Sequence, residues 1–301
     1  MSKYSKLLQE LKGRGIPFSE GEPLKRHTTF AIGGPCDFFV APETEQQLEW
    51  TLSFCQTNQI PVFVLGRGSN LLVSDDGFRG LILSTERLKR ISLLPGHRIF
   101  CASGVPLFRL CKFALEHALS GLEFAYGIPG SVGGAIYMNA GAYGGEVGDL
   151  LCRADCICAD GQRRSYARDE LQFAYRTSRF QTENSVITAG IFQLSPADSD
   201  AVREQMEEYY RRRKEKQPLE FPSAGSTFKR PKGNYASALI EQCGLKGASV
   251  GGAQVSEKHS GFVINRENAS CKDVEALIAK IQKEVFDKMG YVLECEVQQL
   301  G

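Results

Sequence analysis

The sequence lacks the features of several protein classes. Its 301 residues include one tryptophan and four histidines, and no run of 18 apolar residues occurs, so we expect no membrane-spanning helix. Lysine and arginine number 36 against 35 acidic residues, a net charge of +1. That balance argues against a nucleic-acid partner and against a polybasic membrane binder. Residues 1–11 are polar and resemble no secretory signal, which predicts a cytoplasmic protein.

The ten cysteines lack the spacing of a disulfide scaffold or a zinc site. No Cys-x-x-Cys pair occurs, and no histidine lies at zinc-finger spacing from a cysteine. The one close group is Cys152, Cys156 and Cys158, which would share one face of a strand. We therefore expect reduced, buried cysteines and no metal site.

Glycine is what the sequence has in excess. There are 31 glycines, and eight of them fall within the 22 residues from Gly127 to Gly148. Such a stretch needs backbone freedom or the close approach of another group. Apolar Ile128, Val132 and Ile136 predict a largely buried path, which suits a long, flat cofactor that carries a pyrophosphate. Tight packing of a helix on a sheet is the alternative.

A second glycine-containing loop, Gly66 to Asn70, follows a predicted strand at 61–65. Its Gly-Arg-Gly-Ser-Asn sequence suits a phosphate-binding nest of main-chain N–H groups. It lacks the third glycine and the following helix of the dinucleotide-binding fingerprint, and it lacks the Gly-Lys-Ser/Thr of a P-loop. A plain turn is the alternative.

Length predicts about two domains, and Asp198-Ser199-Asp200 separates a β-rich part from an α+β last third. Capping residues predict helices that begin at Thr44 and Ser270, and the second has its apolar face at Val274, Leu277 and Ile281. Further helices are predicted at 3–12, 106–119 (closed by Gly121), 201–216 and 235–243. Strands are predicted at 71–73, 81–84, 91–94, 99–102, 152–158, 163–166, 186–194 and 291–297.

Seven short motifs follow one another along the chain. Three of them read His27-Thr28-Thr29-Phe30-x-Ile32-Gly33-Gly34, Gly66-x-Gly68-Ser69-Asn70-Leu71-Leu72 and Gly127-Ile128-Pro129-Gly130-Ser131-Val132-Gly133-Gly134. The others read Tyr175-Arg176-x-Ser178-x-Phe180, Ala224-Gly225-Ser226-x-Phe228-Lys229, Gly252-Ala253-Gln254-Val255-Ser256-x-Lys258-His259 and Leu293-Glu294-x-Glu296-Val297. In this order they resemble the UDP-N-acetylenolpyruvoylglucosamine reductase family over essentially the whole chain.

The resemblance implies an α+β fold. A two-subdomain FAD-binding region of the vanillyl-alcohol-oxidase-like (PCMH) class would occupy residues 1–82 and 83–199, and a C-terminal α+β substrate-binding domain would occupy 200–301. The implied activity is NADPH-dependent reduction of the enolpyruvyl ether of UDP-N-acetylglucosamine to UDP-N-acetylmuramate, for peptidoglycan synthesis. It also implies non-covalent FAD, NADPH as co-substrate, a UDP-sugar substrate and a monomeric enzyme that acts on a CH–CH bond.

The same resemblance places FAD on the two glycine-containing loops. The implied cofactor-binding residues are Thr29, Gly66, Arg67, Gly68, Ser69, Asn70, Gly127, Ile128, Pro129, Gly130, Ser131, Gly133 and Gly134.

Three catalytic residues are implied as well. Arg176 would offset the negative charge that develops on the substrate carboxylate, and Ser226 would give a proton to carbon. Glu296 would assist, best if protonated. On a strand, the side chains of Glu294 and Glu296 would point to the same face, and the negative charge of one carboxylate would raise the pKa of the other. Without the resemblance, Arg176 and Glu296 are interpreted as surface strand residues.

Tyr175, Lys216, Arg230 and Gln254 are the implied substrate contacts. Arg230 stands where the family commonly has asparagine, so that contact differs here. A long tyrosine-bearing insertion of one branch of the family is not evident, which indicates the shorter branch. His259 is interpreted as a structural residue, because a lone histidine is more often structural than catalytic.

Two other functions remain open at this point. A flavin-dependent oxidase of the same broad fold would let O₂ reoxidise the cofactor. A non-enzymatic nucleotide-binding module would also use the two loops, but it leaves the last third of the chain unexplained.

Overall fold

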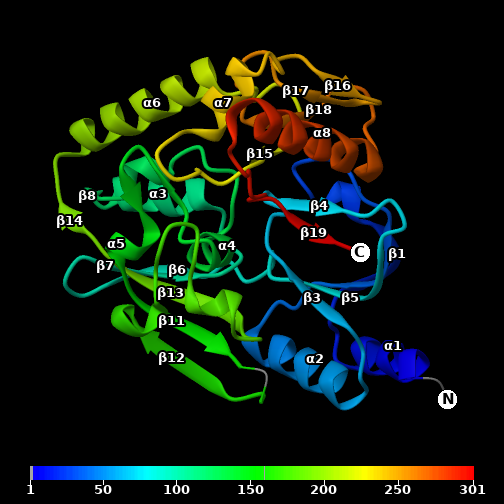
Figure 1. Ribbon diagram of the computed structural model, residues 1–301. Coiled ribbons are helices and arrows are strands. Elements are labelled where there is room, and N and C mark those ends of the chain that lie inside the picture. Colours follow the sequence, from blue (N-terminus) through cyan, green and yellow to red (C-terminus); the bar gives the residue numbers. More distant parts are fainter. Residues whose placement is uncertain (1–2, 159) are drawn as a thin grey trace. The chain divides into compact units, whose positions relative to one another are not determined.

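The computed structural model describes residues 3–158 and 160–301 (Figure 1). The chain forms two compact units, which are described separately. Unit 1 comprises Met1–Glu20, Phe38–Arg67 and Gly80–Arg212, and unit 2 comprises Gly21–Asp37, Gly68–Arg79 and Arg213–Gly301. The three-domain division at residues 82 and 199 stays a prediction.

Helices and runs of strands follow one another along the described residues. The α-helices are α1 (Lys3–Gly13), α2 (Glu45–Thr57), α3 (Leu107–Glu116), α4 (Val132–Tyr137), α5 (Val147–Leu150), α6 (Ser199–Lys216), α7 (Ala236–Gln242) and α8 (Cys271–Met289). The first strands are β1 (Phe18–Pro23), β2 (Pro35–Val40), β3 (Val62–Leu65), β4 (Leu71–Val73), β5 (Phe78–Ser84), β6 (Ile91–Leu94), β7 (Arg98–Ala102), β8 (Leu119–Ser120), β9 (Gly141–Ala142) and β10 (Gly145–Glu146). The later strands are β11 (Leu151–Ile157), β12 (Arg163–Ala167), β13 (Val186–Gln193), β14 (Ser195–Pro196), β15 (Ser223–Ser226), β16 (Ser249–Val250), β17 (Ala253–Val255), β18 (Phe262–Asn265) and β19 (Gln298–Leu300).

Unit 1 contains a five-stranded sheet of order β12-β11-β13-β7-β6. All its neighbouring strands are antiparallel, and the strands predicted at 152–158 and 163–166 are confirmed as β11 and β12. Helix α4 packs on the central strand β13. A β-carbon on Gly190 of that strand would lie 2.8 Å from Cδ1 of Ile136, so the glycine permits the close approach of helix and sheet.

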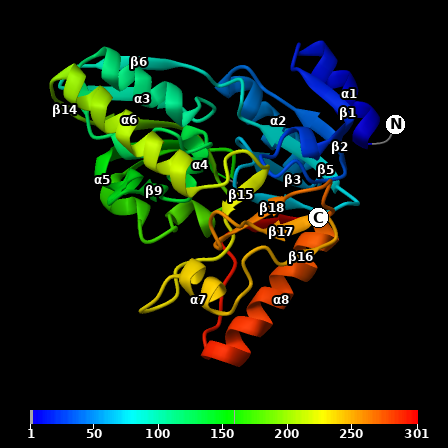
Figure 2. The same cartoon turned by 90° about the horizontal axis from the view of Figure 1, so that it is seen from above.

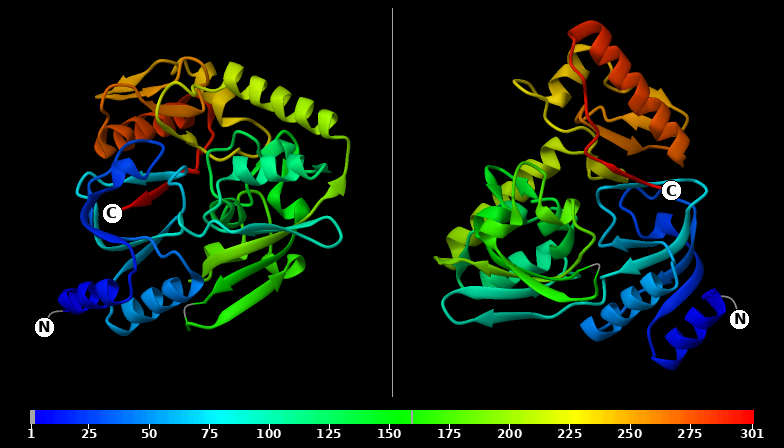
Figure 3. Two further views of the ribbon diagram at one scale, coloured as in Figure 1. Left: turned by 180° about the vertical axis from the view of Figure 1, so that it is seen from behind. Right: turned by 60° about the horizontal axis from the view of Figure 1, so that its bottom comes forward.

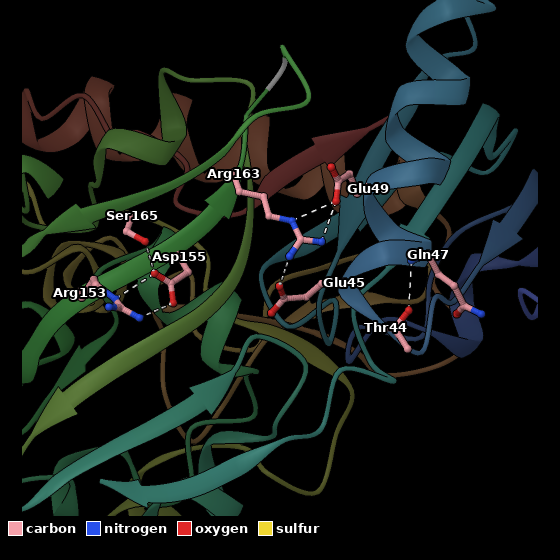
Figure 4. Close-up of polar contacts among 8 residues, drawn as sticks. All are labelled: Thr44, Glu45, Gln47, Glu49, Arg153, Asp155, Arg163 and Ser165. Carbon is pink, nitrogen blue, oxygen red and sulfur yellow. Dashed lines mark hydrogen bonds and ion pairs between the residues drawn. The ribbon is translucent and has the colours of Figure 1, made fainter. Parts of the chain in front are cut away.

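Helix α2 begins where the sequence predicts. The hydroxyl of Thr44 accepts a hydrogen bond from the main-chain amide of Gln47 over 3.2 Å (Figure 4), which is the expected N-cap. Figure 4 also shows Arg163 of β12 reaching two carboxylates of this helix, with Nη2 at 2.7 Å from Glu49 and Nη1 at 3.4 Å from Glu45. These exposed ion pairs orient the hairpin more than they stabilise it.

Unit 2 contains a four-stranded antiparallel sheet of order β15-β18-β17-β16. The long helix α8 packs beside β16 and β17, as the orange strands and orange-red helix of Figures 2 and 3 show. Its predicted apolar face is confirmed, because Val274, Leu277 and Ile281 are all fully buried. Ser270 caps its N-terminus as predicted.

Two predicted boundaries are wrong. The helix predicted to reach Leu119 ends at Glu116, because Ala118 adopts a left-handed φ of 53° and Leu119 starts strand β8. Residues 291–297 form no strand; Cys295 makes one isolated bridge to Phe228. The nearby strand is β19, which pairs in parallel with β4, a long-range partner that local alternation cannot reveal.

All ten cysteines are free thiols, as predicted, but the expected burial holds for only seven of them, because Cys152, Cys158 and Cys295 are half-buried. Burial raises the pKa of the Cys55 thiol to about 12, so that group stays protonated near neutral pH and behaves as a small apolar residue. Among the described residues, no helix combines the length and apolar character that crossing a membrane requires.

Candidate functional site

The two glycine-containing loops meet in unit 1. Gly66 follows β3, and Ser131 precedes α4. A β-carbon on Gly66 would lie only 2.5 Å from Oγ of Ser131, while Cβ of Ser131 stays at 3.7 Å, so a larger residue there would force the Ser131 hydroxyl out of its position. Two segments that are 65 positions apart in the sequence therefore form one surface, as a shared ligand requires.

Ser131 also organises the start of α4. Its hydroxyl accepts a hydrogen bond from the Gly134 amide over 3.4 Å, while Gly134 and Pro129 stay exposed. The amides of Val132 and Gly133 donate to the carbonyl oxygens of Val105 and Ser103, at 2.9 and 2.8 Å. These two amides are thus already engaged within the fold.

Gly133 supports the packing interpretation of the glycine excess. It is buried, and a β-carbon there would lie 2.8 Å from Cβ of Ser103. The hydroxyl of Ser103 is itself buried, and no partner for it lies within hydrogen-bond distance among the described residues. A buried polar atom without a partner is costly, and Ser103 is fully buried, so this hydroxyl lies in the packed interior and not on the surface of the two loops.

In unit 2, the remainder of the first loop packs on the segment around Thr29. The carbonyl oxygen of Gly68 accepts from the Thr29 amide over 3.2 Å, and a β-carbon on Gly68 would collide with the carbonyl oxygen of His27. The Thr29 hydroxyl donates to the carbonyl oxygen of Ser223 at 2.7 Å. Thr29 therefore joins this loop to strand β15, which carries Ser226.

Ser226 is the last residue of β15 and is exposed. It lies opposite Phe262 of β18, and the register between the two strands shifts between Ser223 and Ser226. Gly225 supplies a φ of 79° in this irregular stretch. Such bulges change the direction in which a side chain leaves a strand, so the predicted proton donor occupies a locally specialised backbone.

Glu296 lies beside Ser226 in unit 2. Its amide donates to the carbonyl oxygen of Thr227, the residue after Ser226, over 2.9 Å. Its own carbonyl oxygen accepts from the side-chain amide of Asn70 at 3.0 Å. The structure thus places the main chain of Glu296 between Thr227, the neighbour of the predicted proton donor, and Asn70, a predicted cofactor-binding residue.

The prediction that Glu294 and Glu296 share one face of a strand is wrong. The Glu294 carboxylate lies 3.3 Å from the Lys229 ammonium group, and its side chain is 70% exposed. Because residues 291–297 form no strand, the two side chains do not share a strand face. The like-charge argument for a protonated Glu296 therefore loses its geometric basis.

Arg176 lies in unit 1, in a tight turn. Ala174 and Thr177 exchange main-chain hydrogen bonds of 3.1 and 3.0 Å across it, and Arg176 has a left-handed φ of 55°. Its guanidinium Nη2 donates to the carbonyl oxygen of Gly141 at 3.2 Å. This position is a turn, where the interpretation without the resemblance expected a surface strand.

The implied substrate contacts are spread over both units. In unit 1, Tyr175 is 48% exposed beside Arg176, whose guanidinium lies 5.2 Å from its ring. In unit 2, Lys216 ends α6 and is exposed, and the Arg230 guanidinium lies 4.6 Å from the Tyr235 ring. Gln254 lies on β17 and donates to the carbonyl oxygen of Gly247 at 3.1 Å.

His259 has a structural environment, as the sequence interpretation holds. Its Nδ1 accepts a hydrogen bond from the Gly261 amide over 3.1 Å, and its ring meets the Phe262 ring edge-on. Burial lowers the pKa of this imidazole from its ordinary value. The accepting Nδ1 fits the neutral ring.

Three polar residues were missed by sequence reasoning. Asn139 is fully buried and Gln181 is exposed; both contact the Arg176 turn. Arg213 is buried in the exposed, basic last turn of α6 and bonds to Gln217 over 3.1 Å. The Asn-Ala-Gly-Ala-Tyr-Gly stretch that contains Asn139 was read only for its glycines, and Gln181 and Arg213 carry no local signal.

Comparison with known proteins gives one consistent family. The profile of the family described as UDP-N-acetylenolpyruvoylglucosamine reductase, C-terminal domain, matches residues 217–300, and that of an FAD binding domain matches residues 36–166. The UDP-N-acetylenolpyruvoylglucosamine reductase of Clostridium botulinum (strain Hall) is 46% identical over 280 residues, which cover 93% of this chain and 91% of that protein.

Solved structures agree with the sequence matches. The crystal structure of the UDP-N-acetylenolpyruvylglucosamine reductase of Thermus caldophilus has a TM-score of 0.81 and 32% identity, covering 95% of this chain and 99% of that one. A berberine-bridge-enzyme-like protein of Physcomitrella patens has a TM-score of 0.50 and 15% identity, covering 63% of this chain and 44% of the other. The second likeness shows the fold alone. The expected fold class and the family resemblance are thereby confirmed.

Proposed function

Because this chain belongs to the UDP-N-acetylenolpyruvoylglucosamine reductase family, we propose that it reduces the enolpyruvyl ether of UDP-N-acetylglucosamine to UDP-N-acetylmuramate. NADPH is the proposed electron donor, and FAD is held without a covalent bond. The product serves peptidoglycan synthesis. A cytoplasmic location and a monomeric state stay predictions.

The residues present fit an FAD. The contact between Gly66 and Ser131 brings the two loops together, while Pro129 and Gly134 of the second loop stay exposed. These observations support a ligand that lies across both loops. When bound, FAD would supply hydride chemistry, which links oxidation of NADPH to reduction of one alkene carbon of the substrate.

The chain's own residues would manage the charge and the proton. Addition of hydride to one alkene carbon leaves negative charge on the other carbon and on its carboxylate. Arg176 would offset that charge, because its planar guanidinium suits a carboxylate. Ser226 Oγ would deliver the proton to the second carbon, which completes the addition of two hydrogens across the double bond.

Glu296 would act beside Ser226. The observation that carries this proposal is the 2.9 Å hydrogen bond from the Glu296 amide to the carbonyl oxygen of Thr227, since it fixes the two proposed catalytic residues on adjacent main-chain segments. Tyr175, Lys216, Arg230 and Gln254 are proposed to hold the UDP-sugar. Because Glu294 pairs with Lys229, the proposed role of Glu296 does not depend on a like charge from Glu294.

Steady-state consumption of NADPH tests the proposal. Purified protein loaded with FAD should consume NADPH in proportion to added enolpyruvyl substrate and form one UDP-N-acetylmuramate per NADPH. UDP-N-acetylglucosamine, which lacks the double bond, is the matched control and should give no consumption. Rapid consumption in air without any enolpyruvyl substrate would instead identify an oxidase, and a protein that takes up no FAD would contradict the proposal.

A further inference from the structure

The turn that carries Arg176 holds a conformation that its sequence disfavours. Arg176 is the third residue of the four-residue turn from Ala174 to Thr177, and its φ is 55°. Turns with a left-handed third residue usually place glycine or asparagine there, because a β-carbon crowds the backbone. Strain of this kind persists only where the surroundings hold it, and it concentrates at functional positions.

Side-chain amides hold both ends of this turn. Asn139 Nδ2 donates to the carbonyl oxygen of Ala174 at 3.1 Å. Gln181 Nε2 donates to the carbonyl oxygen of Arg176 itself at 2.8 Å and to that of Tyr137 at 3.0 Å. The Gln181 amide therefore joins the strained peptide directly to the end of helix α4.

The segment at residues 137–141, which contacts the turn, is itself held by hydrogen bonds. Asn139 is fully buried; its Nδ2 also donates to Glu146 at 2.9 Å, and its Oδ1 accepts from the Gly148 amide at 2.8 Å. The Ser178 hydroxyl donates to the carbonyl oxygen of Tyr137 at 2.7 Å. Residues 137–141, which also accept the Arg176 guanidinium at Gly141, thus form a rigid support that continues from the glycine-rich helix.

We propose that Gln181 is a positioning residue for Arg176. Its amide holds the carbonyl group that follows the strained φ, so its loss lets the peptide relax toward an ordinary conformation and turns the guanidinium away from its place. Gln181 is exposed, so its substitution leaves the core intact. This inference rests on the proposed role of Arg176 toward the substrate carboxylate.

The chain offers a closely matched control in Gln193. That residue is also an exposed glutamine of unit 1 whose Nε2 donates to two carbonyl oxygens, of Gly96 at 2.9 Å and of Leu194 at 3.1 Å. Gln181→Met and Gln193→Met remove equivalent bonds while preserving side-chain length. Of these bonds, only the one from Gln181 to the carbonyl oxygen of Arg176 contacts the Arg176 turn.

Separate rapid-mixing measurements on the FAD-loaded protein distinguish the roles. We expect Gln181→Met to slow reoxidation of the cofactor by the enolpyruvyl substrate about tenfold, and to change its reduction by NADPH less than twofold. Gln193→Met should change both rates less than twofold. A purely structural role for Gln181 would slow both steps alike, and that outcome would overturn the inference.

A double-mutant cycle identifies the residue through which Gln181 acts. In an Arg176→Met background, adding Gln181→Met should change the reoxidation rate less than twofold, whereas additive losses would contradict the inference. Calorimetric binding gives a readout besides turnover: Gln181→Met should weaken binding of the enolpyruvyl substrate and leave binding of UDP-N-acetylglucosamine, which lacks the carboxylate, unchanged. Equal binding losses for both ligands would also contradict it.

The Arg176→Met variant tests the role of Arg176 separately from the positioning role of Gln181. If Arg176→Met alone leaves reoxidation unchanged, the proposed function of Arg176 is wrong. If Arg176→Met slows reoxidation while Gln181→Met does not, only the positioning role of Gln181 is wrong.

Discussion

Glu296 donates its main-chain amide to the carbonyl oxygen of Thr227 at 2.9 Å, although 69 positions separate them in the sequence. This bond fixes Glu296 next to the segment that carries Ser226. Asn70, from the first glycine-containing loop, holds the carbonyl oxygen of Glu296 in turn. The proposed chemistry of the last third of the chain is therefore tied to a predicted cofactor loop.

Substitution of Glu296 by glutamine should lower turnover at least tenfold, because the amide can neither carry negative charge nor deliver a proton. Glu294→Gln is the matched control, since Glu294 is exposed and paired with Lys229. Steady-state kinetics with the enolpyruvyl substrate measure both. Comparable losses in the two variants would remove Glu296 from the catalytic set.

Ser226→Ala should lower turnover at least a hundredfold, because a positioned general acid typically contributes rate factors of ~10² to 10⁴. FAD content and the melting temperature should stay unchanged, since the Ser226 side chain is exposed. Ser223→Ala, on the same strand, should retain most activity. Survival of Ser226→Ala within twofold of the parent would rule out its role as proton donor.

Arg176→Lys should keep the positive charge and still reduce turnover about tenfold or more, which corresponds to about 1.4 kcal/mol of transition-state stabilisation. The reason is geometric: an ammonium group cannot offer the two parallel donors of a guanidinium. FAD affinity should be unaffected. A turnover within about twofold of the parent would show that the guanidinium of Arg176 is not required.

Gly66→Ala should weaken FAD binding severalfold, because the new methyl group would lie 2.5 Å from Oγ of Ser131 and force that hydroxyl away from the Gly134 amide that it caps. Gly13→Ala is the control, since nothing lies within 4 Å of a β-carbon at Gly13. Titration of the apoprotein with FAD measures both affinities. Unchanged affinity in Gly66→Ala would mean that the contact between the loops does not shape the cofactor site.

His259 predicts an acid-sensitive contribution to stability. Burial lowers the folded-state pKa of its imidazole below the ordinary value of 6.5, so the unfolded chain binds this proton first as the pH falls. The contribution is fully present above about pH 6.5 and declines as the pH falls toward the folded-state pKa.

The free energy of unfolding at pH 7.5 and pH 5.5 tests this effect. His259→Gln removes the titrating group, so the variant should lose less stability than the parent between those values. His97→Gln, at an exposed position, should keep the parental pH dependence. An identical loss in His259→Gln and in the parent would show that this histidine does not contribute.

Local signals predicted the longer helices well, although α3 ends earlier than expected and the short helices α4 and α5 were not predicted. The caps at Thr44 and Ser270 are short-range bonds between a side chain and the backbone, so they depend only on residues three positions apart. The glycine-containing loops were also recognisable as a pair. Their mutual contact, through Gly66 and Ser131, needs the folded chain.

The errors have the opposite origin. Residues 291–297 alternate like a strand, but the main chain there binds Thr227 and Lys229 only intermittently, and the strand forms later by pairing with β4. The strain at Arg176 and its support by Gln181 are equally invisible in sequence, because they depend on Tyr137 and Gly141, some 40 positions away. Both features depend on contacts between residues far apart in the sequence, which local patterns do not reveal.

An anaerobic absorbance spectrum follows the proposed reduction and reoxidation of the flavin in a single experiment. The FAD-loaded protein should show the oxidised flavin band near ~450 nm, lose it on addition of one equivalent of NADPH, and regain it when the enolpyruvyl substrate is added but not when UDP-N-acetylglucosamine is added. A band that NADPH bleaches and that the enolpyruvyl substrate fails to restore would contradict the account.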